Sequence, residues 1–94
     1  MGNFVRFIKT LFGKYETGYQ YWVYLDEIKI PEDFKKTPPK FEKLSKKFDY
    51  FMEHGELQSK IILTKDFTLV DGYTSVIVAE AYGIEKVPVW FIEG

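Results

Sequence analysis

The sequence predicts a single small domain of the α+β class. Its 94 residues are enough for one compact core and too few for two. Hydrophobic residues make up 46% of the chain and aromatic residues 19%, which supplies the apolar surface that such a core requires. Segments with helical spacing of apolar residues alternate with segments of strand-like periodicity, in the order helix, strand, helix, hairpin, helix, strand. We therefore expect helices packed on one small sheet.

The composition excludes several kinds of chemistry. The chain contains no cysteine, which rules out disulfides, cysteine zinc sites and thiol catalysis. A single histidine, His54, argues against a transition-metal site, so no metal site is predicted. No apolar run reaches the roughly 20 residues that span a bilayer, and the start of the chain lacks a continuous signal-peptide core. We predict a cytoplasmic protein with no membrane span.

Charge is distributed unevenly along the chain. Residues 1–47 carry a net charge of +4 and residues 48–94 a net charge of −5, within a total of −1. The whole molecule is therefore no general polyanion binder, but one face is expected to be basic and another acidic.

The first 18 residues are expected to form an amphipathic helix and a turn ahead of a domain over 19–94. Their apolar stripe consists of Phe4, Ile8, Leu11 and Phe12. Packing on the domain core is the favoured use of this stripe, and a membrane or partner surface is the alternative.

The next segments alternate between extended and helical patterns. Residues 19–25 have strand periodicity with aromatic side chains on both faces. The segment 32–40 contains Pro38 and Pro39 and is predicted to be a loop. Residues 41–54 have one apolar stripe and end before Gly55, as a helix does. That stripe consists of Phe41, Leu44, Phe48 and Phe51.

The second half predicts a hairpin, a helix and a last strand. Residues 60–64 and 67–70 form two strands about a two-residue turn at Lys65 and Asp66. Residues 73–82 form a helix that ends at Gly83. The strand over 87–92 contains Pro88, which predicts an edge position because proline cannot donate to a ladder.

The junction from strand to helix carries the most specific signal. Asp71 and Gly72 separate the strand that ends at Val70 from the helix that begins at Tyr73. The first N–H groups of a helix lack partners and lie at the positive end of its dipole, so they favour an anion. Thr74 and Ser75 would add hydroxyl donors, and Asp71 would either cap the helix or face a phosphate through a divalent ion. An ordinary capped turn is the competing interpretation.

The order and spacing of several motifs resemble the ParB/sulfiredoxin superfamily over residues 23–92. They are the Pro39-Lys40 pair, the helix that follows it, Gly55, the strand from Ile61, the Leu69 to Ser75 junction and Val87-Pro88-Val89. Small ParB-like domains share the stretch Leu-Val-Asp-Gly-Tyr-Thr-Ser. The resemblance implies a small mixed sheet with helices in one domain.

The resemblance also implies a nucleotide- or phosphate-binding domain with a regulatory or DNA-related role, in a bacterium or its mobile elements. Its ligand would be CTP or ATP/ADP with magnesium, and DNA or a protein would be its partner. The implied phosphate-binding residues are Gly72, Tyr73, Thr74, Ser75, Lys40 and Lys43, with Lys40 in place of the family arginine. Whether the chain is an enzyme stays open.

The chain departs from the ParB pattern at three positions. Tyr73, Thr74 and Ser75 stand where ParB has Glu, Arg and Arg, so two bidentate cations and one carboxylate are absent. Sulfiredoxin chemistry is excluded because its cysteine is missing. The alternative is therefore a non-catalytic interaction module, a small inhibitor or adaptor that kept the fold and lost the nucleotide site.

Overall fold

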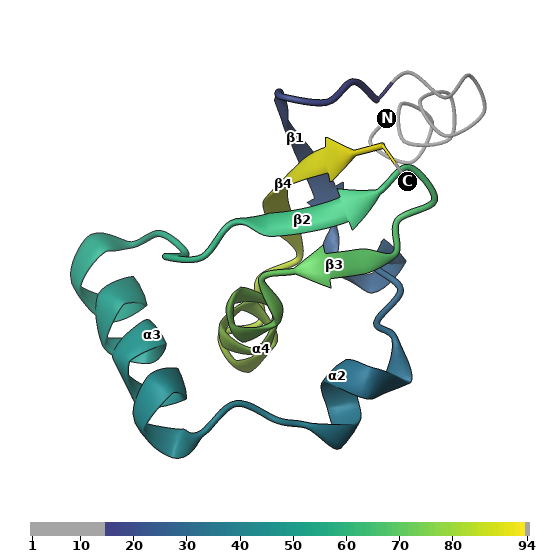
Figure 1. Ribbon diagram of the computed structural model, residues 1–94. Helices are drawn as coiled ribbons and strands as arrows, with labels where there is room; N and C mark the ends of the chain where they lie inside the picture. The colour runs from purple at the N-terminus through teal and green to yellow at the C-terminus, as the bar shows by residue number, and fades with distance from the viewer. Residues whose placement is uncertain (1–14, 94) are drawn as a thin grey trace.

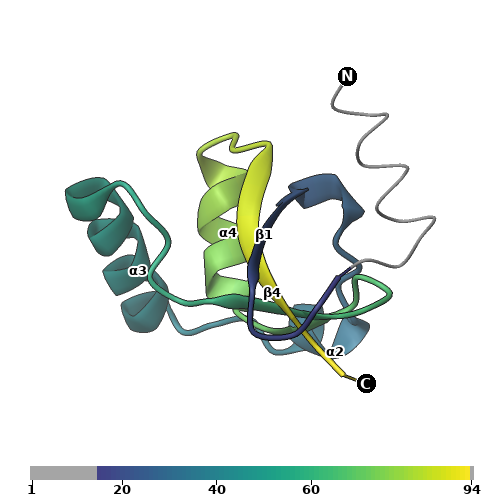
Figure 2. The same ribbon diagram turned by 90° about the horizontal axis from the view of Figure 1, so that it is seen from above.

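The computed structural model describes residues 15–93, which form one α+β domain, as predicted. Its elements, in chain order, are β1 (Gln20–Tyr24), η1 (Leu25–Glu27), α2 (Glu32–Lys36), α3 (Phe41–His54), β2 (Ile61–Thr64), β3 (Leu69–Asp71), α4 (Tyr73–Ala81) and β4 (Lys86–Ile92). Helix α4 lies against the sheet and α3 lies beyond α4, so the molecule is layered (Figures 1 and 2). The amphipathic helix expected near the start of the chain lies outside the described residues.

The four strands form one mixed sheet with the order β1-β4-β2-β3. Strand β4 pairs antiparallel with β1 and parallel with β2, and β2 pairs antiparallel with β3. Strand β3 and helix α4 form the connection between β2 and β4, which are parallel neighbours in the sheet. Figure 1 shows α4 passing beneath the sheet in this connection.

Strand β4 is central, so the edge position predicted from Pro88 is wrong. Pro88 lies opposite Trp22 of β1, but the pairing of β4 with β2 begins only at Val89, opposite Ile61. Pro88 therefore has a paired strand on one side only, which is the situation in which a sheet tolerates a residue without an N–H group.

Alternate residues of the strands face α4 and form the core. Val87, Val89 and Phe91 of β4 are at most 1% exposed, and they belong to one cluster with Val76 and Ala79 of α4. Helix α4 is apolar on most sides because the sheet covers one side of it and α3 another. The core thus fixes where α4 begins relative to the sheet.

The turn between β2 and β3 is longer than the predicted two residues. Phe67 is buried with a φ of 71°, and its N–H donates to the Thr64 carbonyl at 2.9 Å. The hydroxyl of Thr64 donates to the carboxylate of Asp66, and this bond lowers the pKa of Asp66 below its ordinary value of 3.8. Pairing of β3 with β2 begins at Leu69, opposite Leu63, and after a shift in register continues at Asp71, opposite Ile62.

A short helix, α2, occupies part of the predicted loop over 32–40. It follows Pro31, which accepts the N–H of Phe34 at 3.1 Å, and it has acidic residues in its first turn and lysines in its last. This arrangement suits the helix dipole. The two prolines at 38 and 39 lie beyond the end of α2, so they do not interrupt it.

Helix α3 follows the predicted range and is covered only lightly. It ends at Gly55, whose φ is 71° and whose N–H donates to the Phe51 carbonyl at 2.8 Å. Phe48 and Phe51 pack against Tyr82, with ring centroids 5.9 and 4.7 Å apart. Phe41, the first member of the predicted stripe, is 84% exposed, and no residue of α3 is fully buried.

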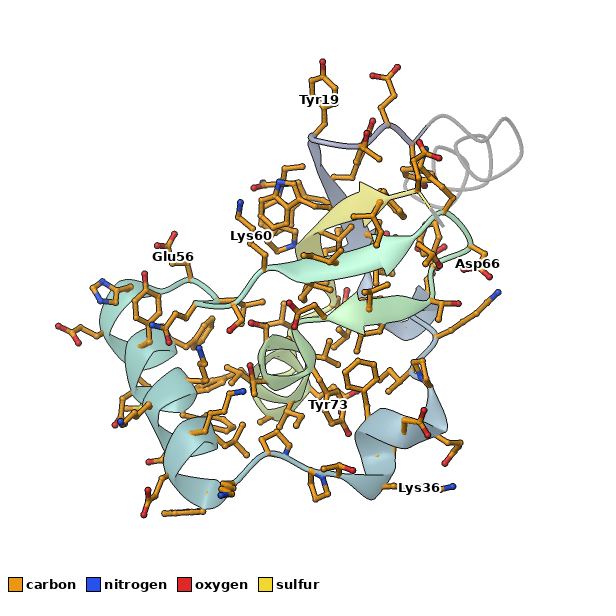
Figure 3. All side chains as sticks on the ribbon, in the orientation of Figure 1. Tyr19, Lys36, Glu56, Lys60, Asp66 and Tyr73 are labelled. Carbon is orange, nitrogen blue, oxygen red and sulfur yellow. The ribbon has the colours of Figure 1, made fainter. Side chains whose placement is uncertain are left out.

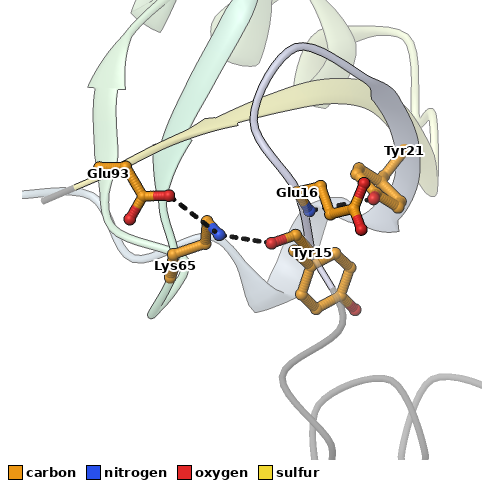
Figure 4. A network of polar contacts seen from close by, with 5 residues as sticks. All are labelled: Tyr15, Glu16, Tyr21, Lys65 and Glu93. Carbon is orange, nitrogen blue, oxygen red and sulfur yellow. Dashed lines mark hydrogen bonds and ion pairs between the residues drawn. The ribbon is translucent and has the colours of Figure 1, made fainter.

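The start of the described chain is bound to the sheet at the hairpin end. Lys65 donates to the carbonyl of Tyr15 and forms an ion pair with Glu93 at 3.6 Å (Figure 4). The Tyr15 ring is buried against Phe91. Residues 15–18 are therefore part of the domain. Within residues 15–93 no helix combines the length and apolar character that a bilayer span requires.

Candidate functional site

The junction between β3 and α4 is built around a glycine that no other residue can replace without strain. Gly72 precedes α4 with a φ of 92°, a region that side chains disfavour. A Cβ atom placed on it would lie 2.3 Å from the Lys60 carbonyl oxygen and 2.8 Å from Cα of Ile61. The chain before β2 and the start of α4 can approach each other only because residue 72 has no side chain.

The first two amides of α4 have no acceptor. The N–H groups of Ser75 and Val76 donate to the Gly72 carbonyl at 3.0 and 3.2 Å. Those of Tyr73 and Thr74 donate no hydrogen bond within residues 15–93. Both lie at the positive end of the dipole of a nine-residue helix.

This helix start opens on a hollow of about 210 Å³. Helix α2 and the proline segment after it contribute lining residues, and α3 contributes Lys43. Ring contact between Phe34 and Tyr73, with centroids 5.4 Å apart, joins α2 to the start of α4. Figure 3 shows Tyr73 directed from α4 toward α2. The lining residues are Phe34, Thr37, Pro39, Lys43, Ser59, Asp71, Gly72, Tyr73 and Thr74.

Comparison with known proteins finds the same fold in solved structures. The Pnob8-like ParB-N domain matches with a TM-score of 0.68 at 18% identity, over 81% of this chain and 30% of its own. ParB from Caulobacter crescentus, C-terminally truncated and in complex with CTP-gamma-S, matches with a TM-score of 0.64 at 19% identity. The match covers 82% of this chain and 46% of that ParB chain. Sulfiredoxin from Arabidopsis thaliana matches with a TM-score of 0.67 at 15% identity, and the match covers 81% of this chain and 86% of the sulfiredoxin chain. This chain has the ParB/sulfiredoxin fold.

These identities are too low to carry a ligand or an activity from one protein to another. No family model matches the sequence, and no curated protein matches it. The chain spans less than half the length of the two ParB structures, so it corresponds to one part of each. The residues that the ParB/sulfiredoxin fold places at the junction therefore have to indicate the function.

Most of the predicted site residues meet at the hollow, and Lys40 does not. Lys43, Gly72, Tyr73 and Thr74 all line it. Lys40 precedes α3 and lines a larger neighbouring hollow of about 570 Å³, which Lys43 also lines. Four lysines and three carboxylates surround that second hollow, so its charge is nearly balanced. Its lining is Lys40, Glu42, Lys43, Lys46, Lys47, Asp49, Tyr50, Glu53 and Gln58.

Ser75 is placed differently from the expectation that its hydroxyl would hold a phosphate. Its side chain is 2% exposed, and its hydroxyl donates to the Ser59 carbonyl at 2.6 Å. This bond connects α4 to the segment before β2. The hydroxyl of Ser75 is therefore engaged in the fold, and of the pair Thr74 and Ser75 only Thr74 lines the hollow.

Asp71 is not the cap of α4, which corrects one of the two predicted roles. It is the last residue of β3, and its carboxylate accepts the N–H of Gly72 at 2.8 Å, while Gly72 itself occupies the cap position. Within residues 15–93, no group of three or more metal-binding side chains surrounds it.

Sequence reasoning missed the residues that other segments bring to this hollow. Phe34 and Thr37 come from the stretch that was expected to be a loop, and Ser59 comes from the turn before β2. The acidic residues directly after Pro31 and the lysines four residues later are the signal that indicates α2. Nothing local marks Ser59, because its role depends on tertiary packing.

Proposed function

We propose that this chain is a ParB-like nucleotide- or phosphate-binding domain with a regulatory or DNA-related role in a bacterium or its mobile elements. One observation carries the proposal. Lys43 lines the same hollow as Tyr73 and Thr74, whose helix-opening N–H groups have no acceptor within residues 15–93. Oriented amides and a cation are the donors that a phosphate group requires.

The size of the hollow indicates which part of a ligand it would hold. Pockets that enclose a whole small molecule measure about 300–1,000 Å³. At about 210 Å³, the hollow matches a phosphate group better than a complete nucleotide. The remainder of the ligand would extend along α3 into the hollow of about 570 Å³, where Lys40 and Lys43 are available. CTP and ATP or ADP with magnesium are the candidates, and CTP-gamma-S is bound in one protein of the same fold.

The expected affinity is modest. The hydroxyl and aromatic residues that replace the Glu-Arg-Arg of ParB supply no bidentate guanidinium contact, so Lys43 and the amides have to hold the phosphate. Asp71 also lines the hollow and opposes a bare anion unless it is paired with a cation. Magnesium is therefore expected to strengthen binding.

Thermal denaturation with CTP, ATP and ADP, with and without magnesium, tests the proposal. A ligand at ten times its dissociation constant stabilises the folded state by about 1.4 kcal/mol. For a domain of this size that raises Tm by about 6–11 °C. Lys43→Ala should remove most of the shift, whereas Lys36→Ala, a change at the exposed end of α2, should keep it. An absent shift at millimolar ligand, or one that survives Lys43→Ala, would contradict the proposal.

An interaction module is the second candidate, and the surface of α3 favours it. Phe41 and Met52 are 84% and 71% exposed, and α3 has no fully buried residue. Exposed apolar side chains gathered on one element are typical of a surface that a protein partner covers. If no nucleotide shifts Tm while light scattering shows association that Phe41→Ser and Met52→Ser abolish, this second function replaces the first.

A further inference from the structure

The side of the sheet that faces away from α4 carries aromatic and cationic side chains. Alternation along each strand places this outer face opposite the core residues. Trp22 is 61% exposed, and Trp90 and Pro88 are partly exposed. The outer face, with the residue that leads into β2, consists of Gln20, Trp22, Tyr24, Lys60, Ile62, Thr64, Lys86, Pro88, Trp90 and Ile92.

The strand register places the two tryptophans side by side. Trp22 lies opposite Pro88 across the β1–β4 pair, and Trp90 is two residues further along β4. Diagonal neighbours of this kind are about 7–8 Å apart on one face of a sheet. Ile62 of β2 lies beside Trp90 and extends the apolar surface. Two large rings are therefore presented in a row on one face.

At the outward positions of β1, β2 and β4 and at Lys60, the charged side chains are lysines, while Asp71 of the edge strand β3 lies opposite Ile62. The ammonium of Lys60 lies 5.0 Å from the centre of the Trp90 ring, and that of Lys86 lies 5.0 Å from the Tyr24 ring. No carboxylate occupies an outward position of β1, β2 or β4. This is notable because residues 48–94 as a whole carry a net charge of −5. The outer face is complementary to an anionic ligand.

We propose that the outer face binds single-stranded nucleic acid, with bases stacked on Trp22 and Trp90 and phosphates held by Lys60 and Lys86. Bases stack on aromatic side chains whatever their sequence, and lysines beside the rings neutralise the phosphates. A duplex hides its base faces, so this face should discriminate against it. A partner that offered only apolar side chains would leave both ammonium groups without counter-charges.

This site does not depend on the proposed phosphate site at Gly72. Although the Lys60 backbone contacts Gly72, Figure 3 shows the Lys60 side chain above β2 and Tyr73 below β3, on opposite sides of the sheet. Nucleic-acid binding and nucleotide binding can therefore be tested separately, and one can fail while the other holds.

The chain contains two tryptophans, and both are on the outer face, so tryptophan fluorescence excited selectively over tyrosine reports on this surface. Titration with 12-nucleotide oligothymidylate or oligouridylate should quench the tryptophan emission, and titration with a duplex of the same length should not. Separate DNA and RNA arms show which single strand is preferred. Fluorescence anisotropy of labelled oligonucleotide gives the affinity independently.

Substitutions at exposed positions test the assignment without unfolding the domain. Trp22→Ala should weaken binding roughly 5- to 150-fold, the range for one lost stacked base, and Trp22→Phe should retain most of the affinity. Lys60→Ala and Lys86→Ala should each lower the slope of log affinity against log salt by about 0.7. Met52→Ala and Lys36→Ala are the matched controls on other surfaces and should change neither quantity.

Three outcomes would overturn the proposal. They are an unquenched emission at saturating oligonucleotide, equal affinity of the Trp22→Ala and wild-type chains, and duplex binding as tight as single-strand binding. Sedimentation that shows concentration-dependent self-association lost in Trp22→Ala, without an effect of oligonucleotide, would assign the face to a second copy of the chain instead.

Discussion

Replacing Gly72 by alanine tests the close approach that shapes the junction. The added Cβ would lie 2.3 Å from the Lys60 carbonyl oxygen, far inside normal contact, and residue 72 has a φ of 92°. The left-handed backbone costs a non-glycine residue about 1–2 kcal/mol. Overpacking against backbone that has to move adds about 1–3 kcal/mol. The free energy of unfolding should therefore fall by about 2–5 kcal/mol.

Gly83→Ala is the matched control. Gly83 also has a positive φ, 69°, but a Cβ there would meet no atom within 4 Å. This variant carries the backbone strain without the collision, and alanine also reduces the entropy of the unfolded chain. Its loss should be about 1 kcal/mol. Urea unfolding followed by circular dichroism measures both variants. Equal losses within 0.5 kcal/mol, on the order of the error of additivity, would refute the close approach.

Three further predictions concern the core, the helix start and the hairpin turn. Phe91→Ala in the central strand should lower the free energy of unfolding by about 3–5 kcal/mol, whereas Phe41→Ala, at an 84% exposed position, should lower it by at most about 0.5 kcal/mol. Urea unfolding that gives similar losses for the two variants would contradict the described burial. Ser75→Ala should cost about 1–3 kcal/mol because it leaves the Ser59 carbonyl without its donor, and it should not change ligand-induced Tm shifts; the reverse result would place the hydroxyl on the ligand. The pKa of Asp66 is lowered from 3.8, so its contribution to stability is present above that pH and is lost as the pH falls through the lower folded value. The difference in stability between wild type and Asp66→Asn should therefore narrow only in that acid range, and a difference that is constant with pH would contradict the assignment.

Local signals in the sequence predicted most elements because each depends on neighbours in the chain. Gly55 ends α3 with a left-handed backbone, and Gly72 separates β3 from α4, as the pattern indicated. Local signals of this kind do not predict that β4 is a central strand. Strand order is decided by pairing between segments that are distant in the sequence. The sequence around Pro88 does not indicate that this residue is paired with β1 and not with β2. Helix α2 has five residues, too few for apolar periodicity to be recognised.

The residues of the candidate site also fall into two groups, those that local sequence indicated and those that only tertiary packing places. Gly72 and Thr74 were found because adjacent residues in a strand-to-helix turn share one local geometry. Lys43 was included through the family resemblance, and the structure places it at the hollow while Lys40 lies beside it. Burial of Ser75 against the Ser59 carbonyl depends on how closely α4 approaches the chain before β2. That approach is a property of the packed domain, and no local pattern encodes it.

The position of β4 has a consequence for how the chain acquires its structure during synthesis. Strands β1 and β2 do not pair with each other, and β4 lies between them. Until residues 86–92 leave the ribosome, β1 has no strand to pair with, and the hairpin of β2 and β3 presents an open edge. Formation of the sheet therefore waits for the last strand of the domain. During that interval the unpaired strand edges are exposed to pairing with other polypeptides.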